Sequence, residues 1–197
     1  IIYLAAVPQF RYGPSESVEK PWPWGQPNWG TDQLSSKGML RYCIDVPYIS
    51  ETLAQAYDAV WPLLQADAEL VQRARALGLA IAGPAEAVAL VEEMLACQLQ
   101  CCLDGGARSN LPRVSQAVLV LLRALDRSDG QEALQWLYDA GPDRLRTFVT
   151  NNFFPDGTPP EATGGYNSIH CDGLFDLERH LRQLRALHPH CYTEADF

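Results

Sequence analysis

The chain has 197 residues, and 47% of them are hydrophobic, which is enough apolar material to build a folded core and to exclude a disordered protein. Its formal net charge of −9 argues against nucleic acid or an anionic membrane surface as the main partner. An acidic sugar stays open as a partner, because a few Arg and Lys side chains in one cleft can bind carboxylates. No apolar run reaches the roughly 20 residues of a membrane-spanning helix, so we expect no membrane partner.

The two ends of the sequence lack the marks of a complete protein. The chain opens on Ile1 without an initiator Met or a signal-peptide pattern, and it stops at Phe197 shortly after a helical segment. We therefore expect a fragment of a larger protein. A truncated fold exposes a face meant for its neighbours, so we also expect self-association through that face.

Residues 1–46 have the composition of an irregular N-terminal segment that belongs to the same domain as the rest. The stretch from Pro21 to Gly30 holds three prolines, two glycines and three tryptophans, which excludes a continuous helix there. We expect the indole rings to pin this segment to the core. Stacking of a Trp ring on a sugar is the alternative.

From residue 47 onward the hydrophobic residues recur at helical spacing. The pattern predicts helices over 47–82, 84–103, 112–125, 130–152 and 172–187, with an irregular stretch from Phe154 to Tyr166. Strand signals are almost absent, so the sequence predicts an all-α fold of helical hairpins. Hairpins of this length stack into a solenoid or into an (α/α) toroid, and periodicity does not choose between them.

The six cysteines fit no common zinc signature. Cys97 and Cys101 are one helical turn apart, and we interpret them as buried small hydrophobic residues. No metal site is predicted.

Two loops of unusual composition interrupt the helices, and loops of this kind often carry function. The first covers residues 105–110, where Ser109 or Asn110 is of a residue type that commonly caps the N-terminus of a helix. The second covers residues 151–167, and on composition alone it is a turn-rich linker with Tyr166 packed inward.

Both loops resemble segments of the heparinase II/III-type polysaccharide lyases and of related alginate and oligoalginate lyases. The second loop contains Asp156-Gly157, then Glu161, then Gly165-Tyr166. The family places a catalytic tyrosine at that end of the motif and an asparagine one helical hairpin upstream, in a Ser-Asn dipeptide that matches Ser109-Asn110. The resemblance covers about residues 45–180. It implies that residues 47–197 form part of an (α/α) toroid, in a periplasmic or secreted protein.

The resemblance implies catalysis by β-elimination on a uronic-acid polysaccharide, with Asn110 and Tyr166 as catalytic residues. The Asn110 amide would hold the uronate carboxylate, and a tyrosine phenolate would take the C5 proton and return a proton to the leaving oxygen. Arg108 or Arg113 would supply positive charge near the carboxylate. This reaction requires no metal or organic cofactor.

Three further residues belong to the predicted substrate-binding set. Asn167 and His170 follow Tyr166 closely enough to reach the same cleft, and Glu161 is expected to orient the tyrosine loop. The other histidines, His180, His188 and His190, lie on or after the last helix, and we expect them at the surface or at a helix cap.

Two alternative functions remain open at this level. One is a non-catalytic helical scaffold or carbohydrate-binding domain. The other is a toroid glycoside hydrolase, which needs two opposed carboxylic acids and would have to use Asp156 and Glu161. The sequence does not choose among heparan sulfate, alginate and other uronate polymers.

Overall fold

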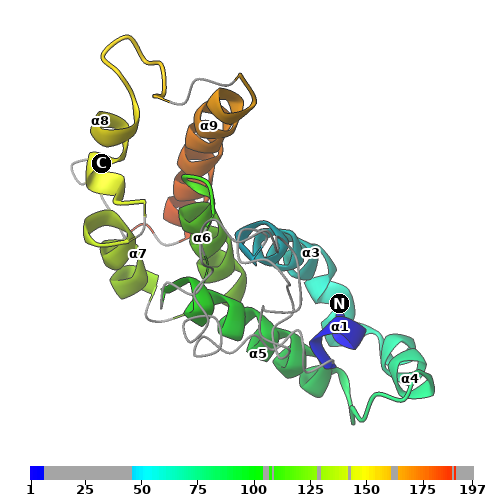
Figure 1. The fold of residues 1–197 in the computed structure, drawn as a ribbon. Helices are drawn as coiled ribbons and strands as arrows, with labels where there is room; N and C mark the ends of the chain where they lie inside the picture. The colour runs from blue at the N-terminus through cyan, green and yellow to red at the C-terminus, as the bar shows by residue number, and fades with distance from the viewer. Residues whose placement is uncertain are drawn as a thin grey trace.

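The computed structural model describes residues 1–6, 46–103, 107, 109–127, 130–141, 143–160, 164–187 and 189. The tryptophan-rich stretch 21–30, Arg108 and Glu161 lie outside these residues, as do Cys43, Cys191, His188 and His190. Every regular element within the described ranges is helical, and no strand occurs there (Figure 1). The prediction of an all-α fold is confirmed.

The elements follow one another along the chain as helices joined by short connections. They are α1 (Ile2–Ala6), α3 (Val46–Ala66), α4 (Ala68–Ala76), α5 (Pro84–Leu103), α6 (Arg113–Leu125), α7 (Gly130–Asp139), the short 3-10 helix η3 (Leu145–Thr147), α8 (Phe148–Asn152) and α9 (Gly164–Leu187). The bounds of α5 and α6 agree with the sequence prediction. The helix α1 falls in a segment that was expected to be irregular, so that part of the prediction is wrong.

The helix predicted over 47–82 is two helices and a loop. Asp67 ends the first and caps the second, because its carboxylate accepts hydrogen bonds from the backbone N–H groups at the start of α4. The second stops at Ala76, and Gly78 then takes a φ of +86°, which continues no helix. The Arg75 guanidinium donates to the Ile81 carbonyl at 2.7 Å and holds the loop that follows.

The helix predicted over 130–152 is also interrupted. α7 ends at Asp139, and a Cβ at Gly141 would lie 2.8 Å from the Leu137 Cα, so only glycine permits the close return of the chain there. Arg144 then takes a left-handed φ of 46° before η3 and α8 begin. The prediction failed because the turn depends on this close approach rather than on apolar spacing.

The last helix starts at Gly164 instead of near Asp172. Tyr166, Asn167 and His170 therefore lie on the first turns of α9, not in the irregular loop where the sequence placed Tyr166. The two glycines before Tyr166 suggested a break in the chain. They instead open the helix, as glycine does where a helix begins.

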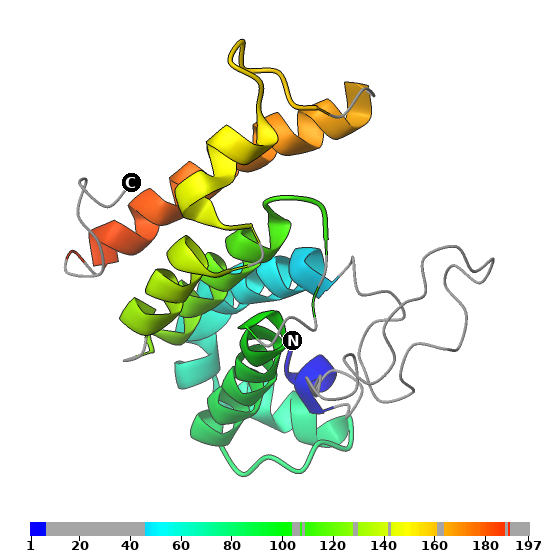
Figure 2. The ribbon, with the colours of Figure 1, turned by 60° about the vertical axis from the view of Figure 1, so that its left-hand side comes forward.

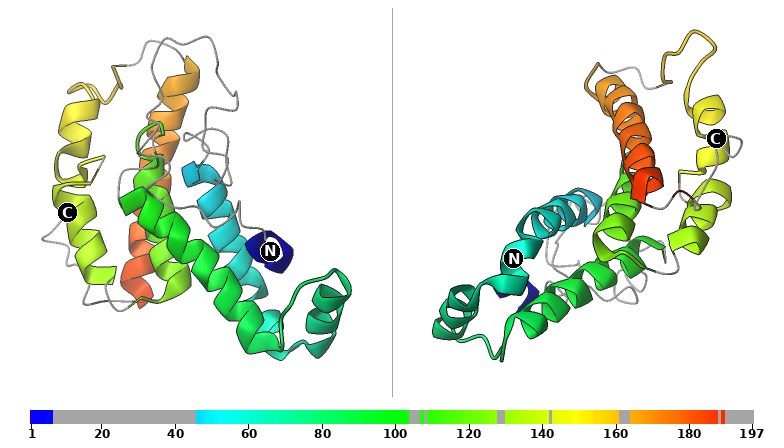
Figure 3. Two further views of the ribbon diagram at one scale, coloured as in Figure 1. Left: turned by 60° about the horizontal axis from the view of Figure 1, so that its bottom comes forward. Right: turned by 180° about the vertical axis from the view of Figure 1, so that it is seen from behind.

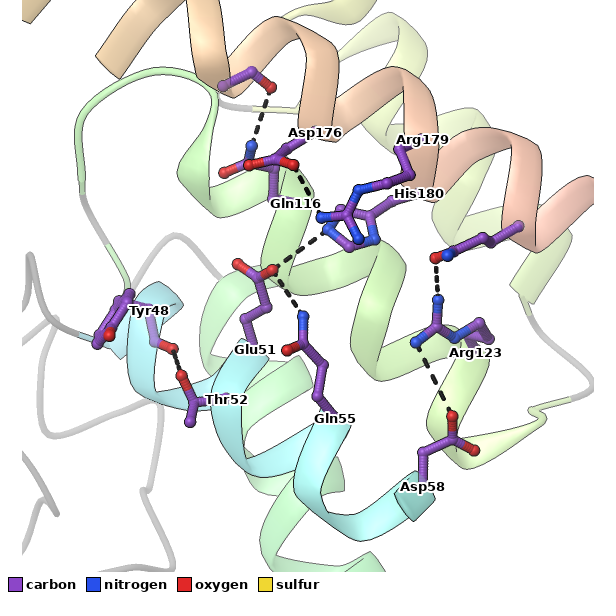
Figure 4. A network of polar contacts seen from close by, with 12 residues as sticks. Tyr48, Glu51, Thr52, Gln55, Asp58, Gln116, Arg123, Asp176, Arg179 and His180 are labelled. Carbon is purple, nitrogen blue, oxygen red and sulfur yellow. Dashed lines mark hydrogen bonds and ion pairs between the residues drawn. The ribbon is translucent and has the colours of Figure 1, made fainter. Parts of the chain in front are cut away.

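Three long helices, α3, α6 and α9, run in the same direction. Asp58 of α3 and Gln183 of α9 both contact Arg123 near the end of α6. Nearer the starts of the helices, Gln116 of α6 and Glu51 of α3 both reach α9. Figure 4 shows these contacts, with residue numbers rising in the same direction along all three helices.

The helix α5 runs the opposite way against α3. Ser50 is bonded to Gln98, whereas Tyr57, further along α3, is bonded to Glu92, which lies earlier in α5. Helices in one direction thus pack beside a helix in the other, as in stacked helical hairpins.

The core is centred on α6, where the nine residues from Val114 to Leu122 are all buried. A helix that is enclosed on every side lies in the middle of its fold. The helices α3, α5 and α9 all pack around α6. Because α3 and α9 run in the same direction as α6, the first residue of α6 marks the end of the molecule at which these helices begin. No helix in the described ranges is long and apolar enough to cross a membrane.

Candidate functional site

The start of α6 abuts the middle of α9. A Cβ at Gly173 would lie 2.5 Å from the Pro112 Cδ, so the absence of a side chain there lets the two segments touch. The Gln116 side-chain amide donates to the Gly173 carbonyl at 2.9 Å, and this contact is buried. Gly173 is therefore the point where the N-terminal end of α6 is anchored to α9.

α9 extends beyond this anchor point by about two turns. Tyr166 precedes Gly173 by seven residues, which corresponds to roughly 10 Å of helix rise and almost two full turns. Residues at this spacing share one helix face, so Tyr166 and His170 continue the face that Gly173 turns toward α6. Figure 2 shows the orange start of α9 projecting past the starts of α6 and α3.

The starts of α3 and α6 lie on one side of α9, next to its projecting part. Asn110 lies in the turn that leads into α6, where its carbonyl accepts a hydrogen bond from the Arg113 N–H at 2.9 Å. Arg113 is the first residue of α6, and both residues are half-buried. The junction thus combines residues from two segments that are far apart in the sequence.

The polar side chains at this junction are not bonded to other residues that the structure describes. They are Asn110, Arg113, Tyr166 and His170, whereas Asn167, which is also unbonded, is one turn before Cys171 and lies on another side of α9. The Asn167 Oδ1 and His170 Nδ1 atoms are shielded from solvent and still have no hydrogen-bond partner. Tyr166 is 44% exposed. A buried polar atom without a partner is costly in a native protein, and a bound molecule or water normally satisfies it.

Most buried polar side chains elsewhere between the helices have a partner, although the Nδ1 atom of His180 is also buried without one. The pairs are Ser50 with Gln98, Tyr57 with Glu92, Ser115 with Asp143, and His180 with Glu51. Burial, and then the bond to Glu92, raise the pKa of Tyr57, so this phenol stays neutral and serves packing. Polar side chains without a partner are thus more frequent at the start of α9 than in the core.

His180 was expected at the surface, and this prediction is wrong. Its ring is 2% exposed, and its Nε2 atom lies 3.2 Å from the Glu51 Oε1 of α3 (Figure 4). The reason is its position on the buried stripe of α9, which contains Gly173, Leu177, His180 and Leu184.

Sequence reasoning missed Asp143, which ties the α7–η3 connection to the start of α6. Its carboxylate accepts hydrogen bonds from the backbone N–H and the hydroxyl of Ser115. Burial raises the pKa of Asp143, although the two bonds from Ser115 act in the opposite direction. The only signal in the sequence is a Gly-Pro-Asp turn, which does not reveal its partner.

Tyr48 was also missed as a site residue. It lies in the first turn of α3, at the end of the molecule where α6 starts, and 61% of it is exposed. A tyrosine beside the proline that opens a helix was the available signal.

The Asp156 side chain forms its hydrogen bonds within a turn. Its carboxylate accepts hydrogen bonds from the Thr158 hydroxyl at 2.7 Å and from the Thr158 N–H at 3.0 Å, and these bonds lower the pKa of this fully exposed group. Gly157, with a φ of +85°, completes the turn. A carboxyl group with a lowered pKa is poorly suited to act as the general acid of a glycoside hydrolase.

An apolar cavity of about 570 Å³ lies between α9 and the segment from α8 to Gly157. Its lining includes Phe154, Cys171 and Phe175, and Figure 3 shows α8 standing apart from α9 on this side. Cys171 and Phe175 are each two residues from Gly173, which places them about 200° around the helix from it. The cavity is therefore separate from the junction and carries few polar groups.

The cysteines and other metal-binding side chains form no metal centre within the described residues. Cys102 and Cys171 are free thiols, and no group of three or more His, Cys, Asp or Glu side chains comes together in this part of the chain. Cys101 is buried as predicted, whereas Cys97, one turn earlier, is only half-buried. Burial is the main cause that raises the pKa of the Cys102 thiol, which makes it unreactive.

The interpretation of the junction therefore depends on its own residues. Comparison with protein-family models, with curated proteins and with solved structures gave no match.

Proposed function

We propose that the protein is a polysaccharide lyase of the heparinase II/III type, which cleaves a uronic-acid polymer by β-elimination. The observation that supports this most is the group of unbonded polar side chains where α9 projects over the start of α6. That group contains an amide, a phenol, an imidazole and a guanidinium, which are the groups needed to hold a carboxylate and to move a proton.

The backbone favours an anionic ligand at the same place. The helices α3 and α6 begin beside the middle of α9, and the N-terminus of a helix carries partial positive charge and free N–H groups. Arg113 adds a full charge that no described carboxylate neutralises. A ligand carboxylate is thus favoured here, although the whole chain is acidic.

In the proposed reaction, Asn110 and Arg113 bind the substrate and Tyr166 transfers the proton. The Asn110 amide and the Arg113 guanidinium bind the uronate carboxylate and stabilise the negative charge that develops on it. The Tyr166 phenolate takes the C5 proton, the C5–H electron pair forms the C4–C5 double bond, and the C4–O bond breaks. The same tyrosine, now protonated, gives the proton to the leaving oxygen, so atoms and charge balance.

The order of the helices supports the toroid part of the proposal. In an (α/α) toroid, consecutive inner helices are parallel and are joined by antiparallel outer helices. The helices α3, α6 and α9 run in the same direction, with α4 and α5 between the first two in sequence and α7, η3 and α8 between the second two, which is the order that the toroid proposal requires.

The test is the formation of unsaturated uronate, followed by its ultraviolet absorbance, on a panel of polymers that includes alginate and heparan sulfate. We expect product with at least one polymer, and we expect Tyr166→Phe to abolish it while the helical circular dichroism stays unchanged. Tyr138→Phe is the matched control, because Tyr138 lies on α7 beside Arg146, away from the junction. Product from the Tyr166→Phe variant at the wild-type rate would refute the proposal.

A further inference from the structure

We propose that Tyr48 is a second sugar-binding residue, which stacks on a different ring of the same polymer from the one that reacts at Tyr166. This inference rests on the proposed function, since it deepens the description of the same site. It assigns the site an oligosaccharide with several uronate units rather than a single sugar.

The direction of Tyr48 follows from its neighbour on α3. Glu51 faces α9, because its carboxylate is bonded to the buried His180. Tyr48 precedes Glu51 by three residues, and residues at this spacing are neighbours on one helix face. The Tyr48 side chain therefore lies on the part of α3 that borders α9, one turn closer to the end where the helices start (Figure 4).

The exposure of Tyr48 is unusual for this end of α3. Three residues beside it in the first turn and a half, Val46, Pro47 and Ser50, are buried, whereas Tyr48 is 61% exposed. Its phenol oxygen has no partner among the described residues. The backbone below it is held in helical form, since the Thr52 hydroxyl donates to the Tyr48 carbonyl at 2.9 Å. A large aromatic ring is thus presented to solvent from a well-ordered turn.

The separation from Tyr166 places Tyr48 on another sugar. Because α3 and α9 are parallel and Glu51 is opposite His180, Tyr48 is level with about Leu177. Leu177 follows Tyr166 by eleven residues, which corresponds to roughly 16.5 Å of helix rise. One sugar ring does not span that distance, so a polymer that reaches both tyrosines must be bound through several units.

The chemistry of the ring suits this role. One face of a pyranose is apolar and can pack on the flat face of an aromatic side chain, while the phenol can bond to a sugar hydroxyl at the edge. Such a contact strengthens binding without taking part in proton transfer. Tyr48 is therefore a substrate-binding residue and not a catalytic one.

The test is the affinity for purified uronate oligosaccharides of two lengths, measured by calorimetry in the Tyr166→Phe background so that the ligand is not consumed. We expect Tyr48→Ala to weaken binding of a hexasaccharide roughly five- to tenfold, as for the loss of one aromatic contact. Binding of a disaccharide should be unchanged. Tyr48→Phe should keep most of the affinity. Phe175→Ala is the matched control, since Phe175 is 73% exposed on the opposite face of α9.

Each outcome bears separately on the two proposals. Equal hexasaccharide affinity with and without Tyr48, or no hexasaccharide binding in the Tyr166→Phe parent, would overturn the inference. The lyase proposal would still stand in either case if the wild-type protein produced unsaturated uronate. A length-dependent loss in Tyr48→Ala, with no elimination by the wild type on any uronate polymer, would support the binding site and refute the lyase.

Discussion

The two halves of α9 use polar residues in opposite ways. From Gly173 to Leu184, the helix is packed against α3 and α6, and the Nε2 atom of its buried histidine, His180, is paired with Glu51, while the Nδ1 atom has no described partner. From Tyr166 to His170, the same helix projects past α6, and the shielded polar atoms of Asn167 and His170 have no described partner.

The difference shows where the fold has been optimised for stability and where it has not. Removing a polar group from water costs free energy unless a hydrogen bond replaces the water, so a stable helix interface pairs its polar groups. Local violations of this rule are expected at functional sites. The first turns of α9 are such a violation, and Asn110 and Arg113 at the start of α6 are also uncommitted.

The largest effect expected in the unpaired half is on catalysis. Asn110→Ala removes the amide that we propose holds the uronate carboxylate, and the turnover rate should fall on the order of 10²-fold, as for the loss of one preorganised donor. The stability should change little, because the Asn110 side chain makes no described hydrogen bond. Initial rates of unsaturated product formation measure the effect. Asn151→Ala, on the exposed end of α8, is the control and should keep the wild-type rate.

The two histidines of α9 provide a direct comparison of the halves. His180→Ala removes a buried ring and its bond to Glu51, so the free energy of unfolding should fall by about 2 kcal/mol or more. His170→Ala removes a shielded nitrogen that has no partner, and the change should stay within about 0.5 kcal/mol. Urea unfolding followed by circular dichroism measures both. Equal destabilisation by the two substitutions would contradict the distinction between the halves.

The boundary between the halves is set by Gly173. Gly173→Ala places a methyl group against the Pro112 ring and should destabilise the fold by a net of about 1–2 kcal/mol, after allowance for the better helix propensity of alanine. Gly165→Ala is the matched control in the projecting half, where no atom lies within 4 Å of the added Cβ. We expect that variant to be neutral or slightly more stable in thermal unfolding. A stable Gly173→Ala protein would argue against close packing at this point.

The smallest effect concerns Asp143, which sits on the paired side of the junction. Its pKa in the folded state is above the ordinary value of 3.8, so the folded state binds the proton more tightly than the unfolded state does. Its contribution to stability is therefore fully present below pH 3.8 and is lost as pH rises through the raised folded-state pKa. Asp143→Asn should remove this part of the pH dependence of unfolding. An identical pH profile in the two proteins would contradict the assignment.

The sequence predicted the helical class and the bounds of α5 and α6, because these depend on regular apolar spacing and on Gly and Pro breaks. It did not predict the interruption at Gly141 or the early start of α9, since both depend on contacts between distant segments. The roles of Asn110 and Arg113 come from the family resemblance and stay predictions. The burial of His180 and the exposure of Tyr48 could not be predicted from the neighbouring sequence, because each depends on how α3 is aligned with α9.

The most direct test of the account is to map where a uronate oligosaccharide binds, by following backbone amide chemical shifts in the Tyr166→Phe protein during titration with a hexasaccharide. We expect the largest changes at residues 110–113 and 165–170, with smaller changes near Tyr48. Changes concentrated at Phe154 and Phe175, around the apolar cavity on the other face of α9, would contradict the account. Saturable binding without changes in the first turns of α9 would contradict it equally.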